Sequence, residues 1–331
     1  MIDLHLHLDG SLAPEEVLEL ADRSGITLPS RDLTALRALL TVEPGCRNLG
    51  EYLEKFALPL QVLQTEETIR LSVYYLLRRL AKQGLCYAEV RFAPQLHLDR
   101  RLTQQQVTAA AVAGLEQAIA ETGMPAQLIL CCMRGAEEAV NLETIRVAHA
   151  FLGRGVCAAD LAGNEAAYPT EDFAPVFALA QQLNLPYIIH AGEAAGGESV
   201  RQALALGARR IGHGVRSLED TDLIALLAQN QVPLETCFTS NLQTKAVADA
   251  AAYPLPFFLA HNLRATVNTD NMTVSGTTLR EEYRALRQLG LTVPQLETLA
   301  CNAAGAAFVT PAQTEQLKAE IARRFSAWLD G

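Results

Sequence analysis

The stretch 1-MIDLHLHLDGSL-12 places two histidines, His5 and His7, at alternate positions of a short apolar run. Such a run is typical of a β-strand, in which residues i and i+2 point to the same face. His5 and His7 therefore share one face, and Asp9 shares it if the strand continues that far. Packing does not explain two adjacent imidazoles, whereas imidazole is the commonest metal ligand. The stretch predicts a strand with two metal ligands, provided that the rest of the chain supplies partners.

The composition favours a large core and excludes some classes of partner. Half of the 331 residues are hydrophobic, and the formal net charge is −10. No cluster of Lys and Arg occurs, so we expect no electrostatic attraction to nucleic acid or to an anionic membrane. No run of about 18 apolar residues predicts a transmembrane helix. The first residues also lack the basic and apolar regions of a secretory signal.

The cysteines indicate a reducing compartment. Their number, seven, is odd, and no CxxC motif occurs. Most lie in apolar runs typical of strands, so we expect buried free thiols and a cytoplasmic protein. The HxE…PCxxC signature of zinc deaminases that act on cytidine is absent. The cysteines are Cys46, Cys86, Cys131, Cys132, Cys157, Cys237 and Cys301.

Eight short runs rich in β-forming residues alternate with longer helical stretches. In a chain of this length the alternation predicts a (β/α)₈ barrel. A doubly wound open sheet is the second possibility, but its glycine-rich phosphate fingerprint after the first strand is missing. We find no internal repeat and no linker, so we expect one domain over residues 1–331. The predicted strands are 2–7, 86–92, 126–133, 156–161, 186–191, 210–214, 232–237 and 264–269.

The connection between the first two predicted strands is far too long for a simple crossover. It contains several helix-like segments, so we expect a helical insertion over about residues 12–85 on the C-terminal side of the barrel. Within it, Leu49, Tyr52, Leu53 and Phe56 are spaced as one face of a helix. This face either packs against the barrel or forms an apolar wall over a ligand.

Further ionisable residues stand where predicted strands end. His190 ends the fifth strand, with Glu193 three residues later, and His213 ends the sixth. Asp270 and Asn271 follow the eighth strand. The C-terminal ends of all barrel strands converge on one mouth, so these side chains should meet there. Burying so many polar groups without a metal or a substrate would cost several kcal/mol.

We interpret His5, His7, His190 and Asp270 as the ligands of one metal ion. Three nitrogens and one oxygen suit Zn²⁺, with a further position for water, although iron, cobalt or manganese also fit. Such a metal lowers the pKa of its water from 15.7 towards about 7. Glu193 then has the place of a general acid/base, and His213 that of a residue that orients hydroxide. Asp270 also accepts a hydrogen bond from the water.

The other three histidines receive weaker interpretations. His149 and His261 lie in helical stretches, so we expect them to be structural or exposed. His97 follows the second predicted strand, and its position alone allows it to reach the mouth.

The motifs HLHLDGSL, EVRFAP, DLAGNE, HAGE, RIGHG and NTDN resemble those of the adenosine deaminases, in the same order and at similar spacing. That family belongs to the metal-dependent amidohydrolases, and the resemblance extends from residue 2 to about residue 310. It implies hydrolytic deamination of adenosine and 2′-deoxyadenosine, with one Zn²⁺ per chain and water as the second substrate.

The resemblance also implies a role for individual positions. His5, His7, His190 and Asp270 match the zinc ligands. Glu193 matches the acid that protonates purine N1, and His213 the residue that positions hydroxide for addition to C6. Asp9 matches the carboxylate that binds the ribose 5′-hydroxyl, and Gly163 the glycine whose N–H meets purine N3. Tyr52, Leu53 and Phe56, within YLEKF, resemble the apolar gate over the purine.

One departure from the family pattern leaves the substrate open. The family commonly has a second Asp where this chain has Asn271, and an Asn amide donates to purine N7 without needing to be protonated. Adenine deaminases tend to carry Glu at the position of Asp9, so Asp9 favours a nucleoside. The alternatives are another 6-aminopurine substrate (aminodeoxyfutalosine, adenine or an N6-substituted adenosine nucleotide) and an inactive relative that only binds a nucleoside. The sequence does not indicate the oligomeric state.

Overall fold

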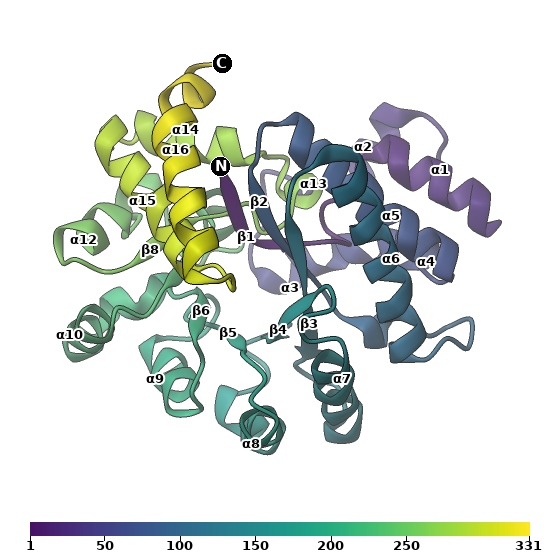
Figure 1. The fold of residues 1–331 in the computed structure, drawn as a ribbon, viewed down its shortest axis with the longest axis horizontal. Coiled ribbons are helices and arrows are strands. Elements are labelled where there is room, and N and C mark those ends of the chain that lie inside the picture. Colours follow the sequence, from purple (N-terminus) through teal and green to yellow (C-terminus); the bar gives the residue numbers. More distant parts are fainter.

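A closed barrel of parallel strands forms the centre of the molecule, and helices surround it (Figure 1). The computed structural model describes residues 1–331. Its strands form two sheets of four, in the orders β1-β2-β3-β4 and β5-β6-β7-β8. The strands are β1 (Ile2–His7), β2 (Tyr87–Phe92), β3 (Ala126–Met133), β4 (Val156–Ala162), β5 (Ile188–Ala191), β6 (Arg210–His213), β7 (Leu234–Thr236) and β8 (Ala265–Val267).

Isolated bridges join the two sheets at both seams. Ala159 of β4 pairs with Tyr187, just before β5, and Leu6 of β1 pairs with Asp270, just after β8. At the second seam His7 N–H donates to Asp270 O at 2.7 Å, and Asp270 N–H donates to His5 O at 2.8 Å. The eight-stranded barrel is therefore closed, which confirms the predicted fold class.

All eight predicted strands are present, but those of the second half are shorter than predicted. The prediction for β7 covers 232–237 and that for β8 covers 264–269, whereas each strand has only three residues. Just after β8, Leu4 N–H of β1 donates to the side-chain Oδ1 of Asn268 at 3.1 Å. A side chain replaces a backbone acceptor there, which interrupts the ladder between β1 and β8.

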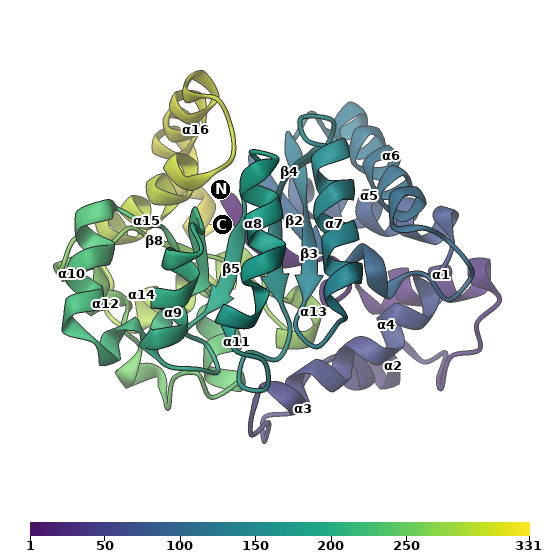
Figure 2. The same ribbon diagram turned by 90° about the horizontal axis from the view of Figure 1, so that it is seen from below.

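Between β1 and β2 the chain forms five helices, α1 (Pro14–Ser24), α2 (Leu33–Leu40), α3 (Leu49–Leu53), α4 (Ala57–Val62) and α5 (Glu66–Lys82). Figure 2 shows α2, α3 and α4 side by side beyond one end of the barrel, while both termini and α16 lie toward the other end. The apolar face predicted as one helix is split, since a 3₁₀ turn at Glu54–Phe56 follows α3.

The remaining helices are α6 (Gln104–Thr122), α7 (Glu138–Ala150), α8 (Ala174–Gln182), α9 (Gly197–Ala205), α10 (Thr221–Asn230), α11 (Phe238–Gln243), α12 (Leu255–Ala260), α13 (Met272–Ser275), α14 (Leu279–Gln288), α15 (Val293–Ala306) and α16 (Pro311–Asp330). Many helices begin at a residue whose side chain accepts a hydrogen bond from the first turn, which is a strong local start signal. Such N-caps are Asp32, Asn48, Thr65, Thr103, Asp220, Thr278, Thr292 and Thr310.

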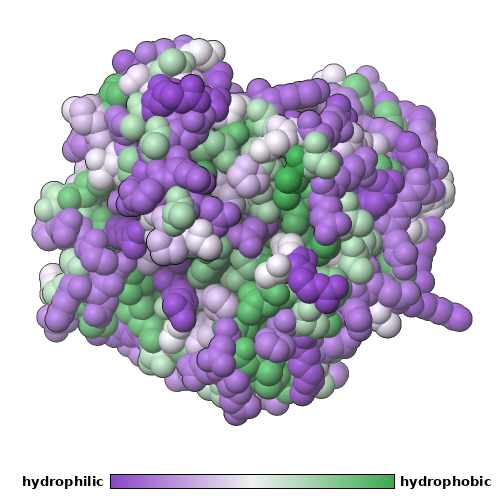
Figure 3. Space-filling view, viewed as in Figure 1, coloured by the Kyte–Doolittle hydropathy of each residue, from purple (hydrophilic) through white to green (hydrophobic).

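One continuous core of 82 buried hydrophobic residues joins the strands to the surrounding helices. The face shown in Figure 3 is largely hydrophilic, with apolar side chains scattered between polar ones. No helix is both long enough and apolar enough to cross a membrane. All seven cysteines are free, and five of them are buried.

Candidate metal centre and active site

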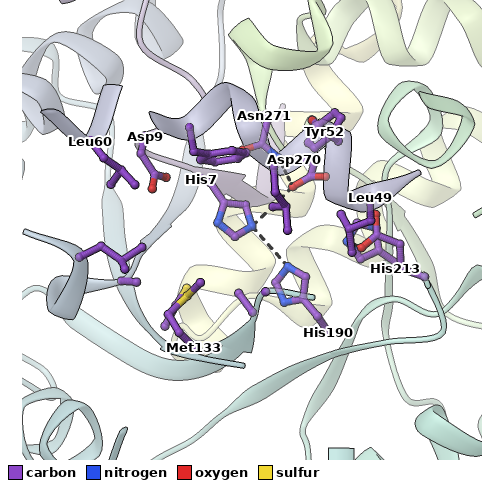
Figure 4. Close-up of a pocket in the computed structure, with 18 residues that line it drawn as sticks. His7, Asp9, Leu49, Tyr52, Leu60, Met133, His190, His213, Asp270 and Asn271 are labelled. Carbon is purple, nitrogen blue, oxygen red and sulfur yellow. Dashed lines mark hydrogen bonds and ion pairs between the residues drawn. The ribbon is translucent and has the colours of Figure 1, made fainter. Parts of the chain in front are cut away.

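Side chains from four strand ends meet at the mouth of the barrel (Figure 4). His5 and His7 come from β1, His190 from β5 and His213 from β6, and Asp270 follows β8 by three residues. His213 and Asp270 have φ angles of 62° and 59°. Such left-handed backbone is uncommon outside glycine and concentrates at functional sites. The sharp turns at these two strand ends direct both side chains into the cavity.

The atoms that would bind a metal are close together. His7 Nε2 lies 3.3 Å from His190 Nε2, and the Nε2 atoms of His5 and His7 each lie 3.5 Å from Asp270 Oδ1. Four ligands about 2.1 Å from one tetrahedral zinc ion would be about 3.4 Å apart. His5 Nε2 is buried without a hydrogen-bond partner. The four predicted ligands therefore fit one divalent metal ion.

Buried carboxylates orient two of these histidines from behind. His5 Nδ1 donates to Glu235 at 2.9 Å, and His190 Nδ1 lies 3.0 Å from Asp160. Arg91 joins both carboxylates, at 2.8 Å each. A carboxylate that accepts from Nδ1 leaves the lone pair on Nε2 free for a metal, and such partners orient ligands in metal sites.

Burial governs the protonation of the remaining polar groups at the mouth. Desolvation raises the pKa of Glu193 well above its usual value, and the nearby charges of Asp270 and Glu165 add to the effect. Burial also lowers the pKa of His213, which favours a neutral imidazole. Burial alone would raise the pKa of Asp270, but the hydrogen bond and charge of His5 outweigh it, so this carboxyl stays ionised.

The loop that carries Glu193 is held by a carboxylate that we did not predict. Glu165 accepts hydrogen bonds from the backbone N–H groups of four successive residues, at 2.6 to 3.0 Å. These residues are Gly192, Glu193, Ala194 and Ala195. The donors fix the backbone of Glu193, so the carboxyl of this side chain projects into the cavity from a rigid loop.

Asp9, Asn271 and Gly163 all line the cavity. Asp9 is buried, its Oδ1 has no hydrogen-bond partner, and burial raises its pKa to about 6. Asn271 donates through Nδ2 to Asp270 Oδ1 at 2.7 Å, and its own Oδ1 lies so close to Gly10 that a Cβ there would overlap it. Gly163 has φ +104°, which other residues rarely adopt.

The insertion supplies one wall of the cavity. Leu49, Tyr52, Leu53, Phe56 and Leu60 all line it, and Figure 4 shows Leu49, Tyr52 and Leu60 beside the polar centre. This face lines the cavity and also packs against the barrel, because Leu49 and Tyr52 share a hydrophobic cluster with Val274. Tyr52 also anchors the wall to the barrel, because its hydroxyl lies 2.7 Å from Ser275 Oγ.

The other three histidines lie away from the cavity. His97 is buried, and its Nδ1 bonds to Leu63 O at 2.9 Å. Its position after the second strand allowed it to reach the mouth, but it does not line the cavity. His149 and His261 are exposed, in agreement with the prediction.

Sequence reasoning missed the residues that support the site. Asp160 and Glu235 are charged residues in the middle of buried strands, and that unusual placement was the available signal. Ser240 and Asn241 of α11 contact Asp270 and His213, at 2.6 and 2.9 Å respectively. Their short polar helix carried no such signal.

A closed (β/α)₈ barrel with a His-rich ligand set at its mouth defines the class of metal-dependent hydrolases. Within that class, the chain belongs to the adenosine deaminase family, because the model of that family matches residues 1–324. A curated relative from Haemophilus ducreyi, named adenosine deaminase, is 47% identical, covering 98% of this chain and 96% of the relative.

Solved structures show the same fold. An adenine deaminase from Arthrobacter aurescens is 30% identical with a TM-score of 0.90, covering 98% of each chain. An amidohydrolase from Burkholderia ambifaria, solved with bound Zn, is 21% identical with a TM-score of 0.88, covering 99% of this chain and 91% of that chain.

Proposed function

We propose that the protein catalyses the hydrolytic deamination of adenosine and 2′-deoxyadenosine, which yields inosine or 2′-deoxyinosine and ammonia. The observation that carries the proposal is the meeting of three imidazole nitrogens and one carboxylate oxygen, with spacings of 3.3 to 3.5 Å among them, beside the Glu193 carboxyl. The curated relatives named adenosine deaminase support the same activity.

We propose one Zn²⁺ per chain, held by His5, His7, His190 and Asp270. When bound, such an ion lowers the pKa of a water molecule to about 7 and so supplies hydroxide at neutral pH. The relative solved with zinc supports this choice of metal. The buried carboxylates behind His5 and His190 keep both rings ready to bind it.

The residues of the chain perform the remaining steps. A protonated Glu193 donates its proton to purine N1, which makes C6 more electrophilic, and general acid catalysis of this kind gives about 10²–10⁴-fold. His213 holds the attacking oxygen, and Asp270 accepts a hydrogen bond from it. Addition to C6 gives a tetrahedral carbon that bears both the hydroxyl and the amino group. The proton that Asp270 takes from the attacking water passes to the amino group, ammonia leaves, and the hydroxyl proton returns to Glu193 as the 6-oxo group forms. Tyr52, Leu53 and Phe56 cover the purine and exclude bulk water.

The polar groups of the cavity favour a nucleoside over a nucleotide. No Lys or Arg is among the residues that line it, so a phosphate would have no cationic partner. The unpartnered Oδ1 of Asp9 needs a donor, which a ribose hydroxyl provides and a phosphate does not. In the proposed complex Asp9 accepts from the 5′-hydroxyl, Gly163 N–H meets purine N3, and Asn271 donates to N7.

Free adenine is the second candidate substrate, because a solved adenine deaminase shares the fold at 30% identity. An inactive nucleoside-binding relative is disfavoured by the complete set of four ligands, Glu193 and His213 at one mouth. We further propose that residues 1–331 form one catalytic domain and that the protein acts in the cytoplasm, where free thiols are stable.

Loss of the ultraviolet band of the 6-aminopurine tests the proposal. Zinc-loaded protein is mixed with adenosine and, in parallel, with 2′-deoxyadenosine, adenine, aminodeoxyfutalosine and N6-methyl-AMP. We expect the fastest change with the two nucleosides and none with the nucleotide. A faster change with adenine or aminodeoxyfutalosine would keep the chemistry and replace the substrate, and no change with any of them would refute the proposed activity.

A further inference from the structure

The histidines at the mouth differ in the group that faces Nδ1, the ring nitrogen that points away from the cavity. Behind the ligands His5 and His190 stand carboxylates, as described above, and a carboxylate only accepts hydrogen bonds. These two rings therefore carry their proton on Nδ1. His213, which is not among the proposed ligands, has no carboxylate behind it. Its Nδ1 lies 2.9 Å from the side-chain Nδ2 of Asn241.

The amide of Asn241 is fixed by contacts on its other side. Its Oδ1 accepts from the backbone N–H of Cys237 at 3.3 Å and from the hydroxyl of Tyr253 at 3.3 Å. If the amide were turned around, its NH₂ group would meet the Cys237 N–H, and two donors would face each other. Asn241 is fully buried and His213 is 1% exposed, so bulk water does not relieve such a clash. The NH₂ group therefore points at His213.

We propose that Asn241 is a positioning residue that fixes the tautomer of His213. The amide donates to Nδ1, so the single ring proton resides on Nε2, the nitrogen that faces the cavity. Nε2 lies 3.5 Å from Glu193 Oε2. In this tautomer His213 is a hydrogen-bond donor to the oxygen that attacks the substrate, and it has no lone pair on Nε2 with which to remove a proton.

This assignment rests on the proposed deamination for its catalytic meaning, but its geometry is independent of the substrate. It separates His213 from the two ligands His5 and His190. Rings backed by a carboxylate present a bare nitrogen for a metal, whereas the ring backed by an amide presents an N–H. Removal of a proton from water then falls to a carboxylate, and Asp270 is the one beside the proposed metal site, with its Oδ1 3.5 Å from the Nε2 atoms of His5 and His7.

Nitrogen NMR of the zinc-loaded protein, labelled with ¹⁵N only in histidine, tests the assignment directly. A ring nitrogen that carries a proton and one that does not give well-separated signals, and loss of one ring in His213→Gln identifies the signals of His213. We expect a protonated Nε2 and a bare Nδ1. A proton on Nδ1, or on both nitrogens at neutral pH, would overturn the proposal whether or not adenosine is the substrate.

Asn241→Asp tests the role of the amide with nearly the same shape. One carboxylate oxygen still accepts from Cys237 N–H, while the other accepts from His213 Nδ1 and so moves the proton off Nε2. We expect the two ¹⁵N signals to exchange character. We also expect kcat to fall by on the order of 10² or more, because a wrong histidine tautomer costs serine proteases about 10⁴-fold. KM for adenosine should change far less.

Two further variants keep the test decisive. Asn141→Asp places a carboxylate at another fully buried asparagine, on α7, and should leave the signals of His213 unchanged. If Asn241→Asp does not fold, Asn241→Ala removes the donor, and both tautomers of His213 should then be populated. Unchanged His213 signals in both Asn241 variants would show that the amide does not set the tautomer.

Discussion

The barrel interior contains two polar layers that differ in how their charges are satisfied. In the lower layer every charged group lies beside an oppositely charged one, although single atoms such as Arg91 Nε have no hydrogen-bond partner. Arg91 contacts Asp160 and Glu235, and Arg210 contacts Glu89 and Glu235, all at 2.6 to 2.8 Å and at most 1% exposed. In the upper layer, at the mouth, His5 Nε2, Asp9 Oδ1, Glu193 Oε1 and Asn271 Oδ1 are buried without a partner.

The difference separates residues that hold the site from those that act in it. An unpaired buried polar atom costs about 1–3 kcal/mol, so a group of them is expected where a metal or a substrate completes the bonds. A buried ion pair adds little net stability, yet removing one partner costs about 3–5 kcal/mol. The lower layer thus fixes geometry, and the upper layer exposes reactive atoms to a ligand.

Glu193→Gln should have the largest effect on catalysis. Gln has the same shape but cannot deliver the proton to purine N1, so we expect kcat/KM for adenosine to fall by about 10²–10⁴-fold, which is roughly 3–5 kcal/mol. Zinc content, measured by mass spectrometry, and the unfolding midpoint should stay near wild type. Near-normal turnover would show that Glu193 is not the general acid.

Arg91→Met should have its largest effect on stability, whereas Glu193→Gln affects catalysis and leaves stability unchanged. It leaves Asp160 and Glu235 with one cation fewer in the buried layer, so we expect a loss of about 3–5 kcal/mol in the free energy of unfolding. The histidines that these carboxylates orient should bind zinc about 10–100-fold more weakly. Urea unfolding and competition with a chelator measure the two effects. Unchanged stability together with lost turnover would show that Arg91 acts in catalysis, and the proposed division between supporting and acting layers would be wrong.

The fold was largely predictable, because strand and helix periods and the His5/His7 spacing are local signals. The exact extent of the strands was not. The ladder between β8 and β1 is interrupted where Asn268, just after the last strand, bonds to Leu4 of the first, and no local pattern contains a contact between residues so distant in the chain. The break after α3 was also unpredicted, since the apolar spacing continues through it.

The candidate site was predictable where residues stand at strand ends and not where they support others. Strand ends converge by topology, so His190, His213 and Asp270 were found without a structure. Glu165 acts through four backbone N–H groups of a different loop. Asn241 contacts Nδ1 of His213, the ring nitrogen that faces away from the cavity. Such contacts depend on three-dimensional packing. Among the supporting residues, only charged residues inside buried strands, such as Glu235, can be recognised from the sequence.

His97 differs from the residues of both layers, because its Nε2 is buried and unpartnered although it lies outside the cavity. Burial lowers its pKa to about 4 from the ordinary 6.5, so the folded state keeps it neutral. Its contribution is complete above pH 6.5 and is lost as the pH falls toward 4. From pH 7 to pH 5 we expect the free energy of unfolding to drop by about 2 kcal/mol on this account. His97→Gln should lose less over that range in urea titrations, and an identical loss would contradict the assignment.

Asp9→Ala should give the smallest effect and the most selective one. Asp9 completes the upper layer only if a ribose hydroxyl donates to its unpartnered oxygen. Losing one such hydrogen bond costs roughly 1.4 kcal/mol, so KM for adenosine should rise about tenfold. Free adenine has no ribose and serves as the internal control, because its KM should not change. Equal losses for both substrates would mean that Asp9 shapes the cavity and does not bind the sugar.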